Sequence, residues 1–147
     1  MRLILVRHGE SKVNAGLVAE KNDLTAKGKQ QTKELKRHLA EEKIEVVYCS
    51  RSERCIQTME EIMEGRPVDI PIYLSKLIGS KKMAEDWSEV RRRVKRFLAD
   101  LKIEYEDNET VLVISHLAVL KMFWFELTGK NVKSIKNGAV AIFDYSK

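Results

Sequence analysis

Apolar residues along the chain form short continuous runs separated by polar stretches. The clearest run, Val-Leu-Val-Ile at residues 111–114, is typical of a central strand that is covered on both faces. Other runs are rich in β-branched residues and end at Gly, Pro, Asn or Ser. Together these runs predict strands at residues 2–6, 44–49, 68–74, 110–115 and 139–145.

Between these runs, apolar residues recur every three or four positions, which is the helical period. The pattern is clearest in a stripe formed by Val90, Val94, Phe97 and Leu101. The helices predicted in this way lie at residues 25–41, 53–64, 85–101 and 119–127. Thr25 is a suitable N-cap for the first helix, and we expect close packing at Gly28 in its first turn.

Strands and helices therefore alternate along the whole chain. This alternation predicts an α/β fold, a three-layer α/β/α sandwich with a mostly parallel central sheet. With 147 residues and no linker-like composition, residues 1–147 are expected to form a single domain.

Composition and charge narrow the function classes. The net charge of +5, from 27 basic and 22 acidic residues, favours an anionic ligand. Nucleic acid is not an expected partner, because Glu is mixed among the basic residues and the run 91–96 lacks interleaved aromatic side chains. We expect that run to be a solvated helix face.

The same sequence gives expectations about the protein's location. The apolar run after Met1 and Arg2 is too short for a signal peptide, and no stretch has membrane-spanning length. Cys49 and Cys55 match neither a disulfide framework nor a zinc site. We expect free thiols, a cytoplasmic protein and no membrane partner.

Candidate chemistry lies at the ends of three predicted strands. Arg7 and His8 follow the first, residues 50–54 follow the second, and Ser115 and His116 follow the long apolar run. In an open parallel sheet, ligands bind beyond the carboxyl ends of the strands. Cations and helix N-termini at one crevice suit a phosphoryl group, and an imidazole can attack phosphorus. Gly9 allows a sharp turn or a close approach to a ligand.

At these residues the sequence resembles the histidine phosphatase superfamily, also called the phosphoglycerate mutase-like family. The resemblance covers almost the whole chain. The matching elements are Arg7-His8-Gly9-Glu10-Ser11, Asn14, Leu-Thr-x-x-Gly-x-x-Gln at residues 24–31, Tyr-x-Ser-x-x-x-Arg-x-x-Gln-Thr at residues 48–58, and Ser115-His116.

The resemblance implies a role for each matched residue. His8 would be the nucleophile that forms a phosphohistidine, while Arg7, Arg54 and His116 would bind the phosphoryl oxygens. Asn14 and Ser11 would help to bind the substrate. Neither a metal nor another cofactor is implied. His8 must be neutral to attack, so we expect its other ring nitrogen to be held by a backbone carbonyl.

Two departures from the family pattern concern the leaving group. Lys76 stands where family members often carry a Glu that protonates the leaving group, and Glu85 is the candidate that remains for this acid. Leu117-Ala118 replaces the frequent Gly-Gly after the second His and predicts a bulkier pocket wall. Lys76, Lys81 and Lys82 are candidates to receive a second anionic group of the substrate.

The resemblance predicts a metal-independent phosphatase that hydrolyses phosphate monoesters through a phosphohistidine on His8. A phosphohistidine phosphatase acting on protein is an alternative, because the missing Glu favours leaving groups of low pKa. A mutase-like phosphotransferase is disfavoured by the short chain, and a non-catalytic phospholigand-binding module is a further alternative. The expected partner is a phosphorylated small molecule or a phosphorylated protein, and monomer and homodimer both remain open.

Overall fold

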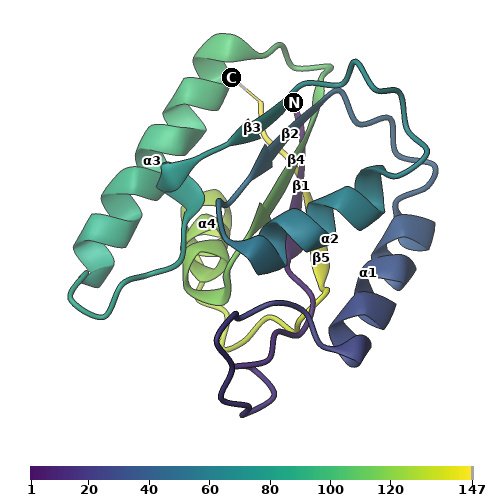
Figure 1. Cartoon of the computed structure of the whole chain (residues 1–147). Coiled ribbons are helices and arrows are strands. Elements are labelled where there is room, and N and C mark those ends of the chain that lie inside the picture. The colour runs from purple at the N-terminus through teal and green to yellow at the C-terminus, as the bar shows by residue number, and fades with distance from the viewer. Residues whose placement is uncertain (147) are drawn as a thin grey trace.

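The computed structural model describes residues 1–146, which form a single five-stranded sheet between two layers of helices (Figure 1). The strand order is β3-β2-β4-β1-β5, and only β5 runs antiparallel to its neighbour. The bounds are β1 (Arg2–Arg7), β2 (Val46–Cys49), β3 (Ile72–Leu74), β4 (Thr110–Ser115) and β5 (Val140–Asp144). The prediction of a mostly parallel α/β sheet is confirmed.

The helices divide evenly between the two faces of the sheet. Helices α1 (Ala26–His38) and α2 (Glu53–Met63) cover one face. Helices α3 (Trp87–Glu104) and α4 (Leu117–Thr128) cover the other. Figure 1 shows this three-layer arrangement, with α3 at the left and α1 at the right. A short 3₁₀ helix, η1 (Lys76–Ile78), lies between β3 and α3.

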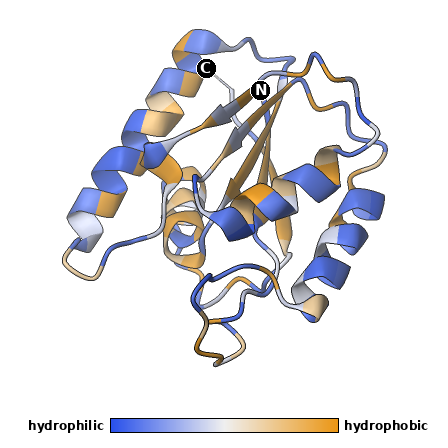
Figure 2. Ribbon diagram, in the orientation of Figure 1, coloured by the Kyte–Doolittle hydropathy of each residue, from blue (hydrophilic) through white to orange (hydrophobic). Residues whose placement is uncertain are grey.

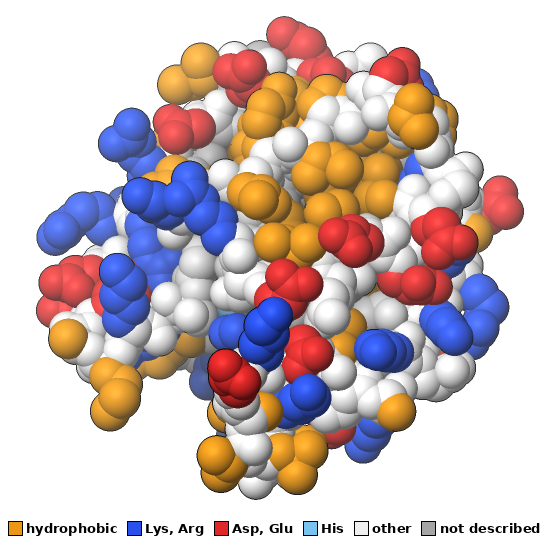
Figure 3. All heavy atoms as spheres, in the orientation of Figure 1, with side chains coloured by type: hydrophobic (Ala, Val, Ile, Leu, Met, Phe, Trp, Pro, Cys, Tyr) orange, Lys and Arg blue, Asp and Glu red, His pale blue; other side chains and the backbone are white. Residues whose placement is uncertain are grey.

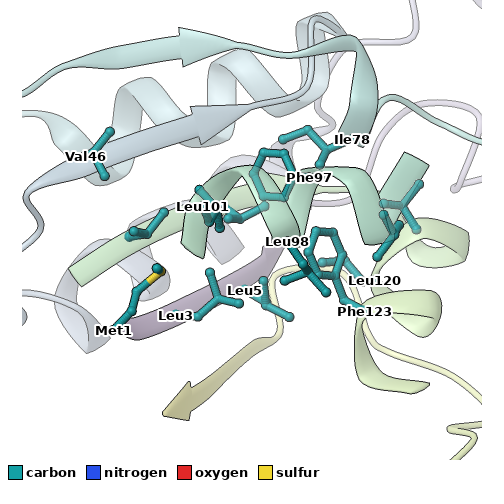
Figure 4. Packing of buried hydrophobic residues seen from close by; sticks show 14 of the residues in the cluster. Met1, Leu3, Leu5, Val46, Ile78, Phe97, Leu98, Leu101, Leu120 and Phe123 are labelled. Carbon is teal, nitrogen blue, oxygen red and sulfur yellow. The ribbon is translucent and has the colours of Figure 1, made fainter. Parts of the chain in front are cut away.

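The strands assign their side chains to the two layers by simple alternation. In β1, Leu3 and Leu5 belong to the core under α3 and α4, while Ile4 and Val6 belong to the core under α1 and α2. Every residue of β4 is buried, as its continuous apolar run predicts. Figure 2 shows these central strands as the hydrophobic interior, and Figure 4 shows the cluster that Phe97 and Phe123 share with Leu3 and Leu5.

Several element boundaries differ from the sequence prediction for local reasons. Strand β3 is shorter than predicted and begins only after Pro71, which has no N–H to donate. Helix α3 begins at Trp87 because Asp86 is its N-cap and forms a capping box with Glu89. The 3₁₀ helix η1 lies in a segment where the sequence pattern predicts neither a strand nor a helix.

Two glycines fix the chain that leaves β1 against the start of α1. A Cβ atom on Gly28 would lie 2.1 Å from the Glu10 carbonyl oxygen, which confirms the close packing predicted there. A Cβ on Gly9 would lie 2.6 Å from the Gly28 carbonyl oxygen. The close approach expected at Gly9 is therefore to the backbone of α1, and it holds the turn after His8 in place.

Candidate phosphoryl site

The carboxyl ends of the neighbouring strands β1, β2 and β4 bring two histidines and an arginine together. The ring centroids of His8 and His116 lie 5.3 Å apart with the rings at 66°. Arg54, in the first turn of α2, places Nη2 3.2 Å from His116 Nδ1. Three segments that are distant in sequence thus meet at one edge of the sheet, as predicted from the strand ends.

His8 is held as a neutral imidazole with one free nitrogen. Its Nδ1 lies 2.7 Å from the Gly9 carbonyl oxygen, which can only accept, so Nδ1 carries the proton and donates it. The expected backbone acceptor is confirmed. Burial lowers the pKa of His8 to about 4, since the side chain is 3% exposed, and the guanidinium groups of Arg54 and Arg7 add to this effect. At neutral pH, Nε2 therefore carries a lone pair.

His116 is held as the opposite tautomer. Because a guanidinium group only donates, Nδ1 of His116 accepts from Arg54, and Nε2–H donates to Ser50 Oγ at 2.7 Å. Burial, followed by the charge on Arg54, lowers the pKa of His116 to about 3. Arg54 thus occupies the His116 nitrogen that an incoming oxyanion could otherwise approach.

Arg7 ends β1 beside this pair. Its Nη1 donates to the Ile135 carbonyl oxygen at 2.6 Å, and burial lowers the pKa of its guanidinium group. Its Nε is buried and has no hydrogen-bond partner within residues 1–146. Buried guanidinium donors without partners are unusual, and an oxyanion is the ligand that satisfies them best.

Ser11 and Asn14 form a small network at the mouth of the site. Asn14 Oδ1 accepts from the Ser11 hydroxyl at 2.9 Å and from the Ser11 amide at 3.1 Å. Asn137 Nδ2 donates to the same oxygen at 3.2 Å and to the His8 carbonyl oxygen at 3.3 Å. Ser11 is buried, whereas Asn14 is exposed, so only Asn14 reaches the surface of the site.

Three other residues of the matched motifs accept hydrogen bonds from backbone amides near the site. Gln31 Oε1 accepts from the Glu10 amide at 2.8 Å, and Gln57 Oε1 accepts from the Leu24 amide at 2.9 Å. Thr58 Oγ1 accepts from the Gly9 amide at 3.1 Å. These side chains tie the turn after His8 to α1 and α2, so they position the site without facing it.

Glu85, the candidate acid, is paired with Arg93 at the start of α3. The two side chains make a bidentate contact, with Nε to Oε2 at 2.8 Å and Nη2 to Oε1 at 3.0 Å. Both are about 15% exposed, and the hydrogen bond from Arg93 lowers the pKa of Glu85. Glu85 is therefore a carboxylate in this conformation.

A crevice of about 430 Å³ lies between Glu85 and the phosphoryl site. We call it the cationic crevice, and its charged lining consists of Arg51, Lys76, Lys82, Glu85 and Arg93. Ser50 and Ser52 line it as well, and both contact His116 Nε2. Lys81, the third predicted lysine, instead lies 5.6 Å from the centre of the Trp87 ring.

The sequence prediction gave no individual role to four residues of this region. Ser50 and Ser52 lie in the predicted segment 50–54, and Ser50 is the Ser of the matched Tyr-x-Ser motif, which was the available signal. No sequence pattern marks Asn137. Arg93 was assigned to the solvated face of the run 91–96, which is wrong for this residue because it is largely buried against Glu85 and the loop before α3. The sequence did carry a signal that Arg93 is buried, because it lies three residues after Val90 and next to Val94, both in the apolar stripe of the helix.

Other candidate chemistry is limited in the described part of the chain. Cys49 and Cys55 are free and buried, as predicted, and burial raises the pKa of both thiols. Residues 1–146 contain no group of three His, Cys, Asp or Glu side chains that could hold a metal ion. Within the same residues, no helix has both the length and the apolar character needed to cross a bilayer.

Comparison with known proteins places this geometry in a family. The model of the histidine phosphatase superfamily (branch 1) matches residues 3–77 and 75–147. Phosphoserine phosphatase 1 of Hydrogenobacter thermophilus is 30% identical over 165 residues, covering 88% of this chain and 77% of that protein. Adenosylcobalamin/alpha-ribazole phosphatase of Salmonella typhimurium is 31% identical over 156 residues, covering 83% and 77%.

The fold comparison agrees with the sequence comparison. The crystal structure of the alpha-ribazole phosphatase from Shigella flexneri superimposes with a TM-score of 0.80 at 25% identity, covering 98% of this chain and 90% of that one. Its likeness extends over all the elements that carry His8, Arg54 and His116. The chain belongs to the histidine phosphatase superfamily (branch 1), the family that its sequence motifs resemble.

Proposed function

We propose that this protein is a phosphatase that hydrolyses phosphate monoesters through a phosphohistidine on His8. One observation carries the proposal: His8 Nε2 has a free lone pair and lies beside Arg54 and His116 at the convergent ends of three strands. The two relatives described above are a phosphoserine phosphatase and an adenosylcobalamin/alpha-ribazole phosphatase, and these names support a phosphomonoester substrate.

The proposed reaction has two displacement steps. In the first, His8 Nε2 attacks phosphorus, the bond from phosphorus to the ester oxygen breaks, and the ester oxygen leaves with a proton. In the second, water attacks the phosphohistidine, inorganic phosphate leaves, and His8 Nε2 regains its lone pair. The N–H donors of Arg7 and Arg54 would stabilise the charge on the phosphoryl oxygens in both transition states.

Substrate binding would rearrange the contact between Arg54 and His116. A phosphoryl dianion is a stronger acceptor for a guanidinium group than a neutral imidazole nitrogen is. Arg54 Nη2 would therefore turn from His116 Nδ1 to the substrate. The released nitrogen could then carry a proton and donate to a phosphoryl oxygen, since the dianion raises the pKa of an adjacent imidazole.

Glu85 is the proposed acid, and its pairing with Arg93 limits it. A carboxylate held by a guanidinium group has no proton to give, so Glu85 must first exchange this partner or take up a proton as the substrate binds. Once Glu85 has given its proton to the leaving oxygen, the same carboxylate can accept a proton from the attacking water.

A kinetic experiment on three proteins tests this proposal. His8→Ala should lower kcat/KM for both an alkyl phosphate and p-nitrophenyl phosphate by about 10⁴-fold or more. Glu85→Gln should lower it about 10²- to 10⁴-fold for the alkyl ester and far less for p-nitrophenyl phosphate, whose leaving group needs no proton. Equal turnover of either ester by His8→Ala and the parent protein would refute the proposal.

A second candidate, a protein phosphohistidine phosphatase, is favoured by the ionised Glu85 and by Lys76 at the position of the expected acid. An imidazole leaving group needs less help from an acid than an alkoxide does. The rate ratio between a phosphohistidine peptide and an alkyl phosphate separates the two candidates. A ratio near one, with full dependence on Glu85, would leave only the monoesterase.

A further inference from the structure

The cationic crevice adjoins the candidate phosphoryl site through two serines that belong to both. Ser50 Oγ lies 2.7 Å and Ser52 Oγ 3.4 Å from His116 Nε2, and both serines also line the crevice. A substrate whose phosphoryl group lies between His8 and His116 can therefore extend its leaving group into this space. The volume of about 430 Å³ fits a small organic group.

Charge in the crevice is strongly one-sided. Its lining holds four cations and one carboxylate, and that carboxylate, Glu85, is already paired with Arg93. Within residues 1–146, Arg51, Lys76 and Lys82 have no carboxylate within 4.0 Å, so their charges are not neutralised by the protein. In Figure 3, Lys and Arg side chains gather on the flank formed by α3 and the loop before it.

A second crevice, which Ser52 also lines, does not share this imbalance. It is lined by Lys21 and Arg54 but also by Asp23 and Glu53, so its cations and carboxylates balance. Of these two crevices, only the cationic one has an excess of cations.

Hydrogen bonds hold the backbone on both sides of Lys76 to the rest of the fold. The Ser75 amide donates to the Cys49 carbonyl oxygen at 2.9 Å, and Ser115 Oγ donates to the Ile78 carbonyl oxygen at 2.7 Å. Arg93 Nη1 donates to the carbonyl oxygens of Leu77 and Gly79, at 2.8 and 2.7 Å. Lys76 therefore projects from a wall that is fixed to β2, β4 and α3.

We infer that the preferred substrate is a phosphate monoester whose leaving group carries a second anionic group, which binds in the cationic crevice at Arg51, Lys76 and Lys82. The inference rests on the proposed function and adds the substrate class to it. A carboxylate and a second phosphate share the chemistry that these cations recognise. A neutral or cationic leaving group would leave these three charges unneutralised.

A matched pair of substrates tests this inference. 3-Phosphoglycerate and glycerol 3-phosphate differ only in a carboxylate against a hydroxymethyl group, and glycerol 1,3-bisphosphate supplies the second phosphate. We expect kcat/KM to be about tenfold or more higher for the two compounds with a second anion, with the advantage shrinking as salt rises. Whichever of the two has the higher kcat/KM, 3-phosphoglycerate or glycerol 1,3-bisphosphate, shows whether the preferred second anion is a carboxylate or a phosphate. Equal values for all three compounds would overturn the inference.

Variants of the crevice lysines test whether the second anion binds in the cationic crevice. In Lys76→Glu/Lys82→Glu, the loss on 3-phosphoglycerate should be at least about tenfold larger than the loss on glycerol 3-phosphate. Lys95→Glu is the matched control, since Lys95 is an exposed lysine on α3 outside the crevice. An equal loss on both substrates in the double variant, or the same selective loss in the control, would refute the placement.

Binding separates this inference from the proposed function. Titration of His8→Ala with the same compounds should preserve the preference for the second anion, because His8 is outside the crevice. If no compound is turned over but the preference in binding persists, the proposed function fails and the inference stands. If turnover is normal and the dissociation constants are equal, the inference alone fails.

Discussion

His8 owes its proposed reactivity to its surroundings. Burial and the guanidinium groups of Arg54 and Arg7 disfavour the imidazolium form, while the hydrogen bond to Gly9 selects the tautomer with Nε2 free. The same burial acts on His116, where the charge on Arg54 is the next largest cause. The pKa values of His8 and His116 are therefore both lowered from the usual value of a histidine.

The lowered pKa values of His8 and His116 can be measured directly, because the chain has only three histidines. NMR titration should give a pKa of about 4 for His8 and about 3 for His116. Arg54→Gln removes a positive charge, so both pKa values should rise, with the larger rise for His116. Titration of His8 near 6.5 in the folded parent protein would contradict the description of the site.

The sequence predicted some site residues and not others for a physical reason. Arg7, His8, Arg54 and His116 follow strand ends that an apolar pattern identifies, and motif spacing supports them. Asn137 and Ser52 instead contact His8 and His116, respectively, across more than 60 residues of sequence. Local patterns carry no information about such contacts.

At the scale of the element, the start of α1 is fitted to the turn after β1. Gly28→Ala should raise intrinsic helix stability by about 1 kcal/mol, yet we expect a net loss of about 2 kcal/mol or more in the free energy of unfolding. The added Cβ would meet backbone of Glu10 at 2.1 Å, which cannot move aside as a flexible side chain can. Urea unfolding measures this change, and Gln30→Ala, at an exposed position of the same helix, is the control. A Gly28→Ala protein more stable than the parent would show that Gly28 does not pack tightly against the backbone of Glu10.

Arg93 holds the loop before α3 in place, because its guanidinium group donates to two carbonyl oxygens of that loop and to Glu85. Hydrogen bonds with a charged partner are each worth about 1.5–3 kcal/mol. In Arg93→Met, the amides of Leu77, Gly79 and Lys82 should therefore exchange with solvent at least about tenfold faster. Hydrogen exchange read by mass spectrometry checks this, and exposed Arg92→Met should change nothing there. Unchanged protection in Arg93→Met would mean that the loop is held by other contacts.

Element positions were predictable where the pattern was long. Strand β4 matches its apolar run at residues 110–115, since a fully buried strand leaves a continuous signal. Strand β3 is shorter than predicted. Val68 and Ile70 continue the apolar pattern, but they lie in a turn between Pro67 and Pro71, ahead of the strand. The buried position of Arg93 depends on tertiary contacts that helical periodicity only suggests.

At the scale of the whole molecule, two buried neutral histidines make stability depend on pH. Their folded pKa values lie below the usual 6.5, so the unfolded chain binds more protons between about pH 4 and 6.5. Stability from these groups is thus present above pH 6.5 and is lost as pH falls through this window. For His8 the loss between pH 7 and 5 is about 2 kcal/mol.

Denaturant unfolding at pH 7 and pH 5 checks this slope. His116→Asn should reduce the loss by about 2 kcal/mol, because it removes one of the two buried imidazoles. A parent protein equally stable at both pH values would contradict the buried neutral state of the histidines.

The layered α/β architecture followed from the alternation of strand and helix signals, because both faces of the sheet need covering. What the sequence could not supply was the division of the space around the phosphoryl site into a charge-balanced crevice and a cationic one. That division arises where β2, the loop before α3 and α3 itself meet in three dimensions.

The most direct test of the proposed function is to trap the phosphoenzyme. Protein mixed with an excess of a turned-over monoester, quenched in alkali within one turnover and digested, is analysed by mass spectrometry. We predict phosphate on the peptide that contains His8, stable in alkali and labile in acid, and none in His8→Ala. Turnover with no phosphate on His8, or with phosphate on His116 instead, would contradict the proposal.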